Sequence, residues 1–379
     1  MTIKLSGRID SSNAAQTEVD INKQIGSFNG ELTLDASELE YISSAGLRVI
    51  LRLKKANETT KVINCNSEVY EIFDMTGFTE MMEISKAYRK LSVEGCEVIG
   101  EGANGIVYRT DPDTIVKVYK NPDSLDEIHN ERELARKAFV MGVPTAIPYD
   151  VVQVGDLYGS VFELLDAKSF AKLINEGVSV EELAKQSVEI LKTMHSTVLK
   201  EGELPSKKQE GVIWGKFVEP YLSSATGAKL VKMFEEIPEV NTMLHGDFHI
   251  KNIMQQNGEN LLIDMDTLSM GHPVFEFAGI YAAYIGYGCV DKENGAKFFD
   301  IKREQCLDMW KYTVDYYFSD KSEEELDEIK RMVEIICYAR ILRWMIRRGD
   351  KANEEQKQVI VFCKNYLEEN VPKVERLYY

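Results

Sequence analysis

The chain has 379 residues, of which 44% are hydrophobic and 28% charged, and these proportions are typical of a folded globular protein. Its 45 Lys and Arg residues against 62 Asp and Glu give a formal net charge of −17. A nucleic-acid binder or a protein bound to anionic membranes is therefore disfavoured, because both need a basic face. No apolar run approaches the ~20 residues of a membrane helix, and the first residues lack the apolar core of a signal peptide.

The cysteine pattern also bears on the compartment. The six cysteines form no CxxC pair, and none has a histidine nearby as a zinc site would. We therefore expect buried free thiols in a protein of the reducing cytoplasm.

Residues 1–88 show the pattern of a small α/β unit. Leu32 and Leu34 alternate with polar residues, as in a strand. Residues 45–56 carry an apolar helix face, and residues 61–63 are typical of a second strand. Asn66 is expected to cap a further helix that ends at a glycine.

The composition changes around residues 89–95, which are short of apolar side chains and predict a linker. Strand patterns predominate at 96–163, with one helix near 124–141. Residues 164–379 are mostly helical in pattern. We therefore expect a domain of residues 1–88, followed by a strand-rich part and a helical part.

A glycine-rich stretch, GEGANGIV, begins the strand-rich part and matches the pattern GxGxxGxV through Gly100, Gly102, Gly105 and Val107. Alone, this pattern is weak and could mark an ordinary turn. Here it leads into two β-rich runs separated by a turn rather than into the helix that a dinucleotide-binding loop opens. The context favours a glycine loop that covers ATP phosphates, as in kinases.

Lys117 lies on the second of these β-rich runs, where a kinase lysine meets the α- and β-phosphates. A solvated strand lysine is the ordinary alternative. A partner carboxylate is expected on the following helix, with Glu131 favoured over Glu133, although either could lie on a solvated helix face.

The most specific motif is HGDFHIKN at residues 245–252, followed by Asp264 at the end of an apolar run. Phosphoryl transfer needs a carboxylate that orients the attacking hydroxyl and accepts its proton, and we assign that role to Asp247. Asn252 and Asp264 would supply oxygen ligands to Mg²⁺. The alternative is a hairpin with turn-forming Asp and Asn and incidental histidines. His245 is expected to hold the loop in place and to have no catalytic role.

With these motifs in kinase order, residues 96 to about 370 resemble the aminoglycoside phosphotransferase-like and choline-kinase-like kinases. The resemblance implies a two-lobed protein-kinase-like α+β fold, with ATP and Mg²⁺ as cofactors. It also implies a hinge at Phe162, Glu163 and Leu164 whose backbone meets adenine.

The sequence departs from protein kinases at informative positions. Gly246 replaces an arginine, and Met265 and Asp266 replace the Phe-Gly that usually follows the metal-binding aspartate. Both departures favour a small-molecule kinase. Asp266 could be a further metal or substrate carboxylate, or a turn residue. Glu276 stands where many relatives have an aspartate that braces the catalytic loop.

The segment DASELEYISSAGL at residues 35–47 resembles the STAS domain of bacterial anti-sigma-factor antagonists. The resemblance implies that Ser44 matches the serine that is phosphorylated in those antagonists, although Ser43 stands where they usually have aspartate. A serine here would also serve as a helix N-cap, and the same helix end would tolerate phosphate.

Arg340, Arg343 and Arg347 recur at helical spacing, with Arg348 adjacent. They could pair with acidic neighbours, or could recognise an anionic substrate or partner.

We expect an ATP- and Mg²⁺-dependent phosphotransferase acting on a hydroxyl of an unidentified small molecule. The STAS domain would serve regulation or bind a protein partner, and no nucleic acid or membrane would be bound. One alternative is a signalling kinase acting on a STAS serine; another is a nucleotide-binding module without turnover.

Overall fold

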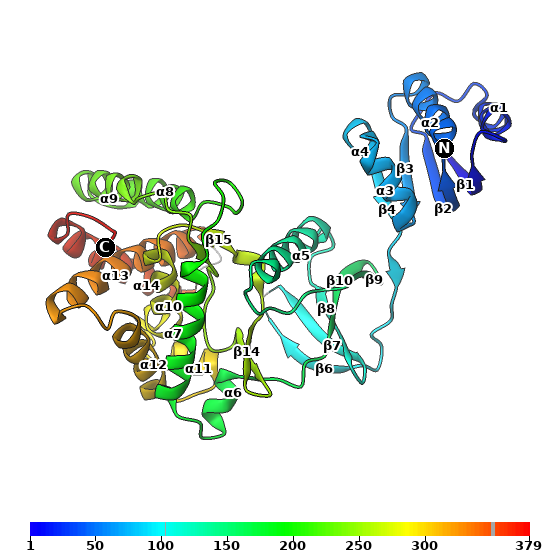
Figure 1. Cartoon of the computed structure of the whole chain (residues 1–379). Coiled ribbons are helices and arrows are strands. Elements are labelled where there is room, and N and C mark those ends of the chain that lie inside the picture. Colours follow the sequence, from blue (N-terminus) through cyan, green and yellow to red (C-terminus); the bar gives the residue numbers. More distant parts are fainter. Residues whose placement is uncertain (103, 350–352) are drawn as a thin grey trace. The chain divides into compact units, whose positions relative to one another are not determined.

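The computed structural model describes residues 1–102, 104–349 and 353–379 (Figure 1). Ala103 of the glycine-rich stretch lies outside the described residues. The chain forms two compact units. The first contains Met1–Cys96, Val118–Pro122 and Val151–Gly159, and the second contains Glu97–Lys117, Asp123–Asp150 and Ser160–Tyr379.

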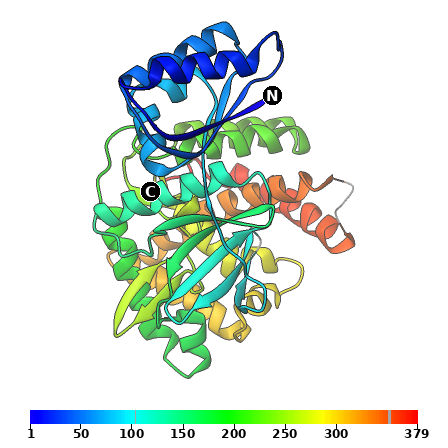
Figure 2. The ribbon, with the colours of Figure 1, turned by 90° about the vertical axis from the view of Figure 1, so that its right-hand side faces the viewer.

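The first unit is an α/β fold built on four strands in the order β1-β2-β3-β4, all paired in parallel. Helices connect the strands, because a parallel pair needs a crossover. Helices α1 and α2 lie side by side (Figure 2). The elements are β1 (Thr2–Ile9), α1 (Ala14–Ile25), β2 (Thr33–Ile42), α2 (Ser44–Ala56), β3 (Lys61–Cys65), α3 (Ser67–Met75), α4 (Phe78–Met81) and β4 (Ile84–Lys86).

Helix ends in this unit follow local chemistry. Asn66 caps α3 as predicted, because its side chain accepts the N–H of Val69. Helix α2 begins one residue earlier than expected, and its cap is Ser43, whose hydroxyl accepts the N–H of Ala45. Ser44 is therefore the first helical residue, and its side chain is exposed.

One short parallel pairing completes the first unit. Within the stretch expected to be a linker, β5 (Arg89–Lys90) pairs in parallel with β9 (Asp150–Val154).

The strand-rich part of the second unit carries the glycine loop and Lys117. Its strands follow the order β10-β8-β7-β6. Along β8, Val116 is buried and Lys117 points to the opposite face, as the two-residue period of a strand requires. The elements are β6 (Glu97–Glu101), β7 (Gly105–Asp111), β8 (Thr114–Tyr119), α5 (Leu125–Val140) and β10 (Leu157–Glu163).

The rest of the second unit is mostly helical, around one large apolar core (Figure 1). Helices α10 and α13 pack together at its centre and are buried on most sides. The helices are α6 (Phe170–Asn175), α7 (Val180–Ser196), α8 (Lys207–Val218), α9 (Ser224–Glu236), α10 (Val274–Tyr284), α11 (Asn294–Phe299), α12 (Arg303–Tyr317), α13 (Glu323–Ile346) and α14 (Glu354–Asn370). Short strands β11 (Lys168–Ser169), β12 (Met243–Leu244), β13 (Ile253–Gln256), β14 (Glu259–Leu262) and β15 (Ser269–Met270) hold the catalytic-loop region. Single 3-10 turns are η1 (Glu219–Tyr221), η2 (Met265–Thr267), η3 (Gly286–Gly288) and η5 (Val371–Lys373).

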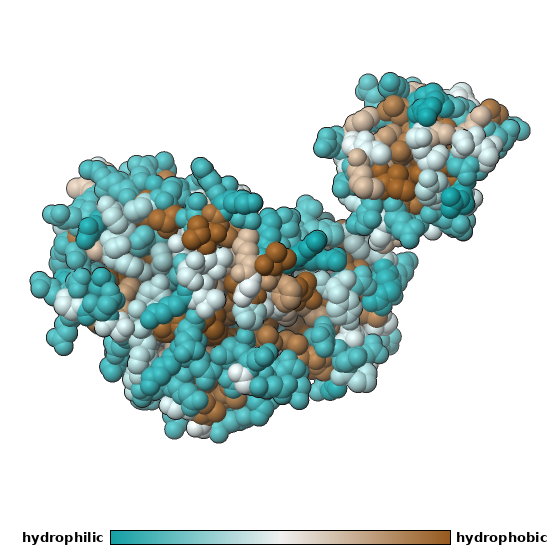
Figure 3. Space-filling view, in the orientation of Figure 1, coloured by the Kyte–Doolittle hydropathy of each residue, from teal (hydrophilic) through white to brown (hydrophobic). Residues whose placement is uncertain are grey.

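Hydrophilic residues cover most of the face drawn in Figure 3, and hydrophobic residues lie in separate groups. Among the described residues, none of the helices combines the length and the apolar character needed to span a bilayer. All six cysteines are free thiols. The expectation that they are buried is wrong for Cys96 and Cys289, which are only half-buried.

Candidate active site

The glycine loop closes the antiparallel hairpin of β6 and β7, where the Gly102 N–H donates to the Gly105 carbonyl at 2.9 Å. The sequence predicted a hairpin of the two β-rich runs that follow the glycines, which are β7 and β8. The glycine loop instead closes the preceding hairpin, β6–β7. Among the described residues, a Cβ on Gly100 would meet only Val107, at 3.8 Å, and a Cβ on Gly102 only the Gly105 oxygen, at 4.0 Å. The fold itself therefore does not require glycine at these two positions, and the missing side chains leave the loop backbone open to a ligand.

Lys117 is held between two carboxylates. Its Nζ lies 3.0 and 3.2 Å from the two oxygens of Glu131, and 2.8 Å from Asp264 Oδ1. The side chains of Lys117 and Glu131 are 17% and 7% exposed, so this pair is well shielded from water. Glu133 instead forms an exposed ion pair with Lys137. The structure thus places Glu131, not Glu133, against the lysine.

The predicted catalytic loop brings Asp247 and Asn252 together. Asn252 is buried, and its Nδ2 donates to the Asp247 carbonyl at 2.9 Å and lies 3.4 Å from Asp247 Oδ2. Because the amide nitrogen is used in this way, the Asn252 side-chain oxygen points away from Asp247. The Asp247 carboxylate is 45% exposed and can meet a substrate.

No role was predicted for His249, although its position three residues before Asn252 in the HGDFHIKN motif marks it as part of the catalytic loop. Its Nε2 lies 3.6 Å from Asp247 Oδ2. Burial lowers the pKa of His249, against the opposing effect of the Asp247 charge. A neutral imidazole therefore packs against the aspartate.

Glu276 on α10 braces the loop. Its Oε2 accepts the His245 N–H at 2.6 Å and its Oε1 accepts the Gly246 N–H at 3.0 Å. Burial raises the pKa of Glu276, but the contacts with His195 and His245 outweigh that effect and hold it below the ordinary value. The glutamate is thus an effective substitute for the usual aspartate, and it stays ionised.

Further hydrogen bonds fix His245 at the start of the loop. The Thr267 hydroxyl donates to the His245 carbonyl at 2.8 Å, and His245 Nε2 lies 3.2 Å from the Ile263 carbonyl. His245 is fully buried, as expected for a residue that holds the loop.

The backbone conformation at position 246 requires glycine. Its φ is +83°, and a Cβ at this position would lie 2.5 Å from the Thr267 carbonyl oxygen. Any side chain here would be strained and would clash, which explains why the arginine of protein kinases is absent.

Asp264 follows β14 in a left-handed conformation, with φ +64° and ψ +62°. Asp266 lies two residues on, in η2, where burial and then the charges of Asp264 and Glu131 raise its pKa to about 7. No cluster of three or more His, Cys, Asp or Glu side chains suited to a metal ion occurs in the part of the chain that the structure describes.

The comparisons with known proteins fit this geometry. Residues 95–289 match the family model described as "Phosphotransferase enzyme family". The chain belongs to this family. Residues 1–91 match the STAS domain model.

The two units are similar to different known proteins. Over 87 residues the chain is 31% identical to the candidate anti-sigma factor antagonist BtrV of Bordetella bronchiseptica, covering 22% of this chain and 75% of that protein. The second unit is similar in fold to a thermostable mutant of aminoglycoside phosphotransferase APH(4)-Ia. Its apo form is 13% identical with a TM-score of 0.50, and covers 72% of this chain and 94% of that one. Its ternary complex with AMP-PNP and hygromycin B is 14% identical with a TM-score of 0.51, and covers 72% and 93%. The predicted fold, an α/β STAS domain with a kinase-like phosphotransferase domain, is confirmed.

The expected hinge of the phosphotransferase unit lies at the end of β10. The Leu164 N–H donates to the Asp113 carbonyl at 2.8 Å. While this bond is made, that amide is engaged and is not available to adenine. Phe162 and Glu163, the last residues of β10, are the other two hinge candidates.

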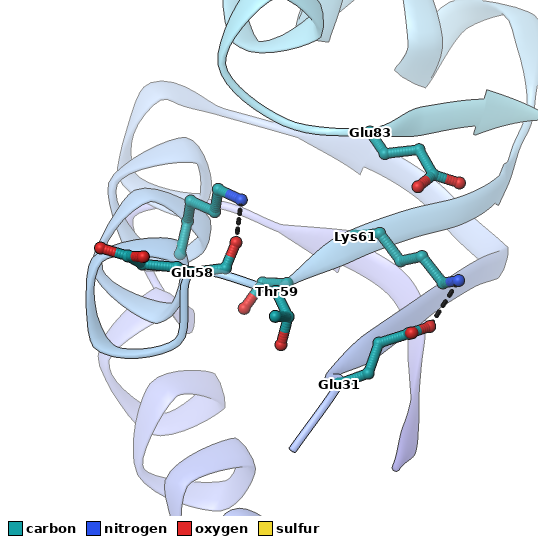
Figure 4. A pocket seen from close by; sticks show the side chains of 7 residues that line it. Glu31, Glu58, Thr59, Lys61 and Glu83 are labelled. Carbon is teal, nitrogen blue, oxygen red and sulfur yellow. Dashed lines mark hydrogen bonds and ion pairs between the residues drawn. The ribbon is translucent and has the colours of Figure 1, made fainter. Parts of the chain in front are cut away.

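The STAS unit has a shallow polar hollow of its own (Figure 4). Lys61 pairs with Glu31 at 2.5 Å, and Lys54 donates to the Glu58 carbonyl. Both lysines are already satisfied by these contacts, so we assign no ligand to the hollow. Its lining residues are Glu31, Lys54, Glu58, Thr59, Thr60, Lys61 and Glu83.

Proposed function

We propose that this phosphotransferase moves the γ-phosphoryl group of ATP, in the presence of Mg²⁺, to a hydroxyl of a small molecule. The observation that carries the proposal is the placement of Lys117, which contacts both Glu131 and Asp264. This joins the glycine-loop sheet to the segment that follows the catalytic loop, as a kinase requires when one lysine and one metal-binding aspartate act on the same phosphates.

Lys117 supplies the positive charge for the α- and β-phosphates. Glu131 restricts its position, since a lysine side chain otherwise has many rotamers. The backbone of Gly100, Gly102, Gly105 and Val107 would cover the phosphates from the β6–β7 hairpin.

The oxygen donors present fit Mg²⁺, which prefers carboxylate and amide oxygens and keeps several waters. Asp264 and Asn252 would hold the ion. When bound, it would neutralise the negative charge that develops on the phosphates during transfer. Lys117 donates to Oδ1 of Asp264, and Oδ2 of the same carboxylate would be the oxygen that holds the metal.

Asp247 would orient the acceptor hydroxyl and take its proton. Its carboxylate is half-exposed, and Asn252 fixes the backbone beneath it. The lack of space at Gly246 leaves no room for the arginine that reads activation-loop phosphate in protein kinases. This supports a small-molecule acceptor.

The test is a phosphorylation screen of a metabolite pool with the full chain, ATP and Mg²⁺, followed by mass spectrometry of the products. A single product class, made by the wild type and not by Asp247→Asn, is expected. Equal product formation by both proteins would refute the assigned base.

For the STAS domain we infer regulation of the kinase or binding of a protein partner. A second candidate, phosphorylation of the STAS serine by the kinase unit, is favoured by one observation. Ser44 is exposed at the first position of α2, and its hydroxyl is not used as the cap. A phosphate there would meet the free amides of the helix end.

Mass spectrometry of the full chain after incubation with ATP and Mg²⁺ separates these two roles. Stoichiometric phosphate on Ser44 that is absent in Asp247→Asn would establish the second candidate. No phosphate on Ser44, with a small-molecule product formed, supports regulation.

A further inference from the structure

The four arginines near the end of α13 form an arginine cluster: Arg340, Arg343, Arg347 and Arg348. None of them pairs with an Asp or Glu within residues 1–102, 104–349 and 353–379. The first alternative for the arginine cluster, pairing with acidic neighbours, therefore has no support among these residues. In a chain of net charge −17, an unneutralised arginine cluster needs another explanation.

The cluster lies beside the catalytic loop. Arg340 Nη1 is 3.4 Å from the position that a Cβ on Gly279 would take, and the Gly246 carbonyl oxygen is 3.7 Å from the same position. Gly246 directly precedes Asp247 in the chain. The Arg340 guanidinium thus approaches the catalytic loop across a glycine of α10 that presents no side chain.

Aromatic rings, rather than carboxylates, support the cluster. The Arg340 guanidinium lies 5.7 Å from the Trp214 ring centroid, and that of Arg343 lies 5.8 Å from the Phe217 ring. Arg348 lies 3.9 Å from the Trp344 ring. An aromatic face holds a cation in place without cancelling its charge, so the charge stays available to a ligand.

Arg343 has an unmet hydrogen-bond donor. Its Nε is buried and has no partner among the described residues. Burial and then the charge of Arg347 lower the pKa of Arg343, and Glu210 is the acid that opposes this. Glu210 itself pairs with Lys207 at 2.7 Å. A buried donor without a partner is costly, and a ligand oxyanion would satisfy it.

We propose that the phosphoryl acceptor carries an oxyanion, either a carboxylate or a phosphate, held by Arg340 and Arg343 while its hydroxyl faces Asp247. The planar fork of a guanidinium matches both groups. This inference rests on the function proposed above and names its substrate class. A polycationic acceptor such as an aminoglycoside would be repelled by the same arginines.

The chemical step is a simple displacement. The acceptor hydroxyl gives its proton to Asp247, and its oxygen forms a bond to the γ-phosphorus. The bond from the γ-phosphorus to the β–γ bridging oxygen breaks, and ADP leaves with the electron pair. The arginines take no proton and serve to position the acceptor.

The test uses the full chain saturated with AMP-PNP and Mg²⁺, so that added anions cannot occupy the phosphate positions of the nucleotide. D-glycerate and glycerol 3-phosphate are the carboxylate and phosphate probes, and glycerol is the uncharged one. Intrinsic fluorescence reports binding, because two of the three tryptophans, Trp214 and Trp344, contact the cluster. We expect saturable binding of at least one anion and none of glycerol.

Arg340→Gln and Arg343→Gln should each raise the Kd of the bound anion about tenfold or more, as expected for a lost charge-assisted hydrogen bond. Arg331→Gln is the matched control, because Arg331 is exposed on the same helix and its Nε donates to the Asp327 carbonyl. It should leave the Kd unchanged. The relative affinity of the two anions identifies which oxyanion is preferred.

Equal affinities in Arg340→Gln, Arg343→Gln and Arg331→Gln would overturn the inference, as would tighter binding of glycerol than of either anion. Affinity for AMP-PNP shows that each variant is folded. Failure of the wild type to bind AMP-PNP would count against the proposed function. Nucleotide binding with no anion binding would overturn only the acceptor class.

Discussion

Lys117 donates a hydrogen bond to Asp264, with Nζ 2.8 Å from Oδ1, although the two residues are 147 positions apart in the chain. This bond brings the sheet of the glycine loop to the segment after β14, where the metal-binding aspartate was predicted. The same lysine is fixed by Glu131 on α5. Strand β8, helix α5 and the distant segment after β14 thus meet at one ammonium group.

The Lys117–Glu131 pair yields the first prediction. Glu131→Gln removes the charge that holds the lysine, and Lys117→Ala removes the cation itself. Charge-assisted bonds of this kind are worth about 1.5–3 kcal/mol, so turnover should fall roughly tenfold or more for each variant. Glu133→Gln, which affects only the exposed pair with Lys137, is the control and should stay near the wild-type rate. Steady-state kinetics decide, and equal rates for the two glutamate variants would show that Lys117 is misassigned.

The second prediction concerns the lack of room for a side chain at Gly246 in the catalytic loop. Gly246→Ala and Gly258→Ala introduce a Cβ at the same φ of +83°, but only the former meets an atom within 4 Å, the Thr267 oxygen at 2.5 Å. Left-handed strain should lower the unfolding free energy of both variants by ~1–2 kcal/mol. Gly246→Ala should lose about 1–3 kcal/mol more through overpacking. Denaturant unfolding measures the difference, and identical unfolding free energies would contradict the local geometry.

Glu276→Gln tests the brace of the loop. A glutamine has one acceptor oxygen, so it can take only one of the two N–H groups of His245 and Gly246, and the other would stay buried without a partner. We expect a loss of about 1–3 kcal/mol in unfolding free energy, together with a lower kcat at nearly unchanged affinity for AMP-PNP. If AMP-PNP affinity falls as much as kcat, Glu276 is not specific to the catalytic loop.

A pH prediction follows from His272. Burial lowers its pKa, although the hydrogen bond to the Tyr379 carbonyl and the His195 charge also act on it. A depressed folded-state pKa means that its contribution to stability is complete above the ordinary value of 6.5 and is lost as the pH falls through the folded-state pKa. The unfolding free energy of the wild type should therefore decline more steeply below pH 6.5 than that of His272→Gln. Parallel curves for the two proteins would contradict this.

Much of the site could be predicted because its residues lie in short motifs. HGDFHIKN fixes Asp247 and Asn252 within one loop, and the spacing to Asp264 follows from a single hairpin. The sequence also distinguishes Glu131 from Glu133. Ile128, Glu131 and Ala135 are buried on one face of α5, so helical periodicity points Glu131 inward.

Other features depend on tertiary contacts or on near-equal local choices. Ser43 and Ser44 are adjacent and both suit an N-cap, so only the backbone shows that Ser43 takes the role. The approach of Arg340 to the catalytic loop depends on packing of α10 against α13, two helices whose register the sequence does not reveal. The brace by Glu276 likewise needs a long-range contact.

The most direct test of the account is calorimetric titration of ATP with Mg²⁺ into the wild type, Asp247→Asn and Asp264→Ala, paired with turnover of the metabolite pool. We predict that Asp247→Asn binds the nucleotide like the wild type but loses turnover, since asparagine fills the site without accepting a proton. Asp264→Ala should lose both, because its carboxylate is the proposed metal ligand. Equal loss of nucleotide binding in the two variants, or normal turnover in Asp247→Asn, would contradict the roles assigned here.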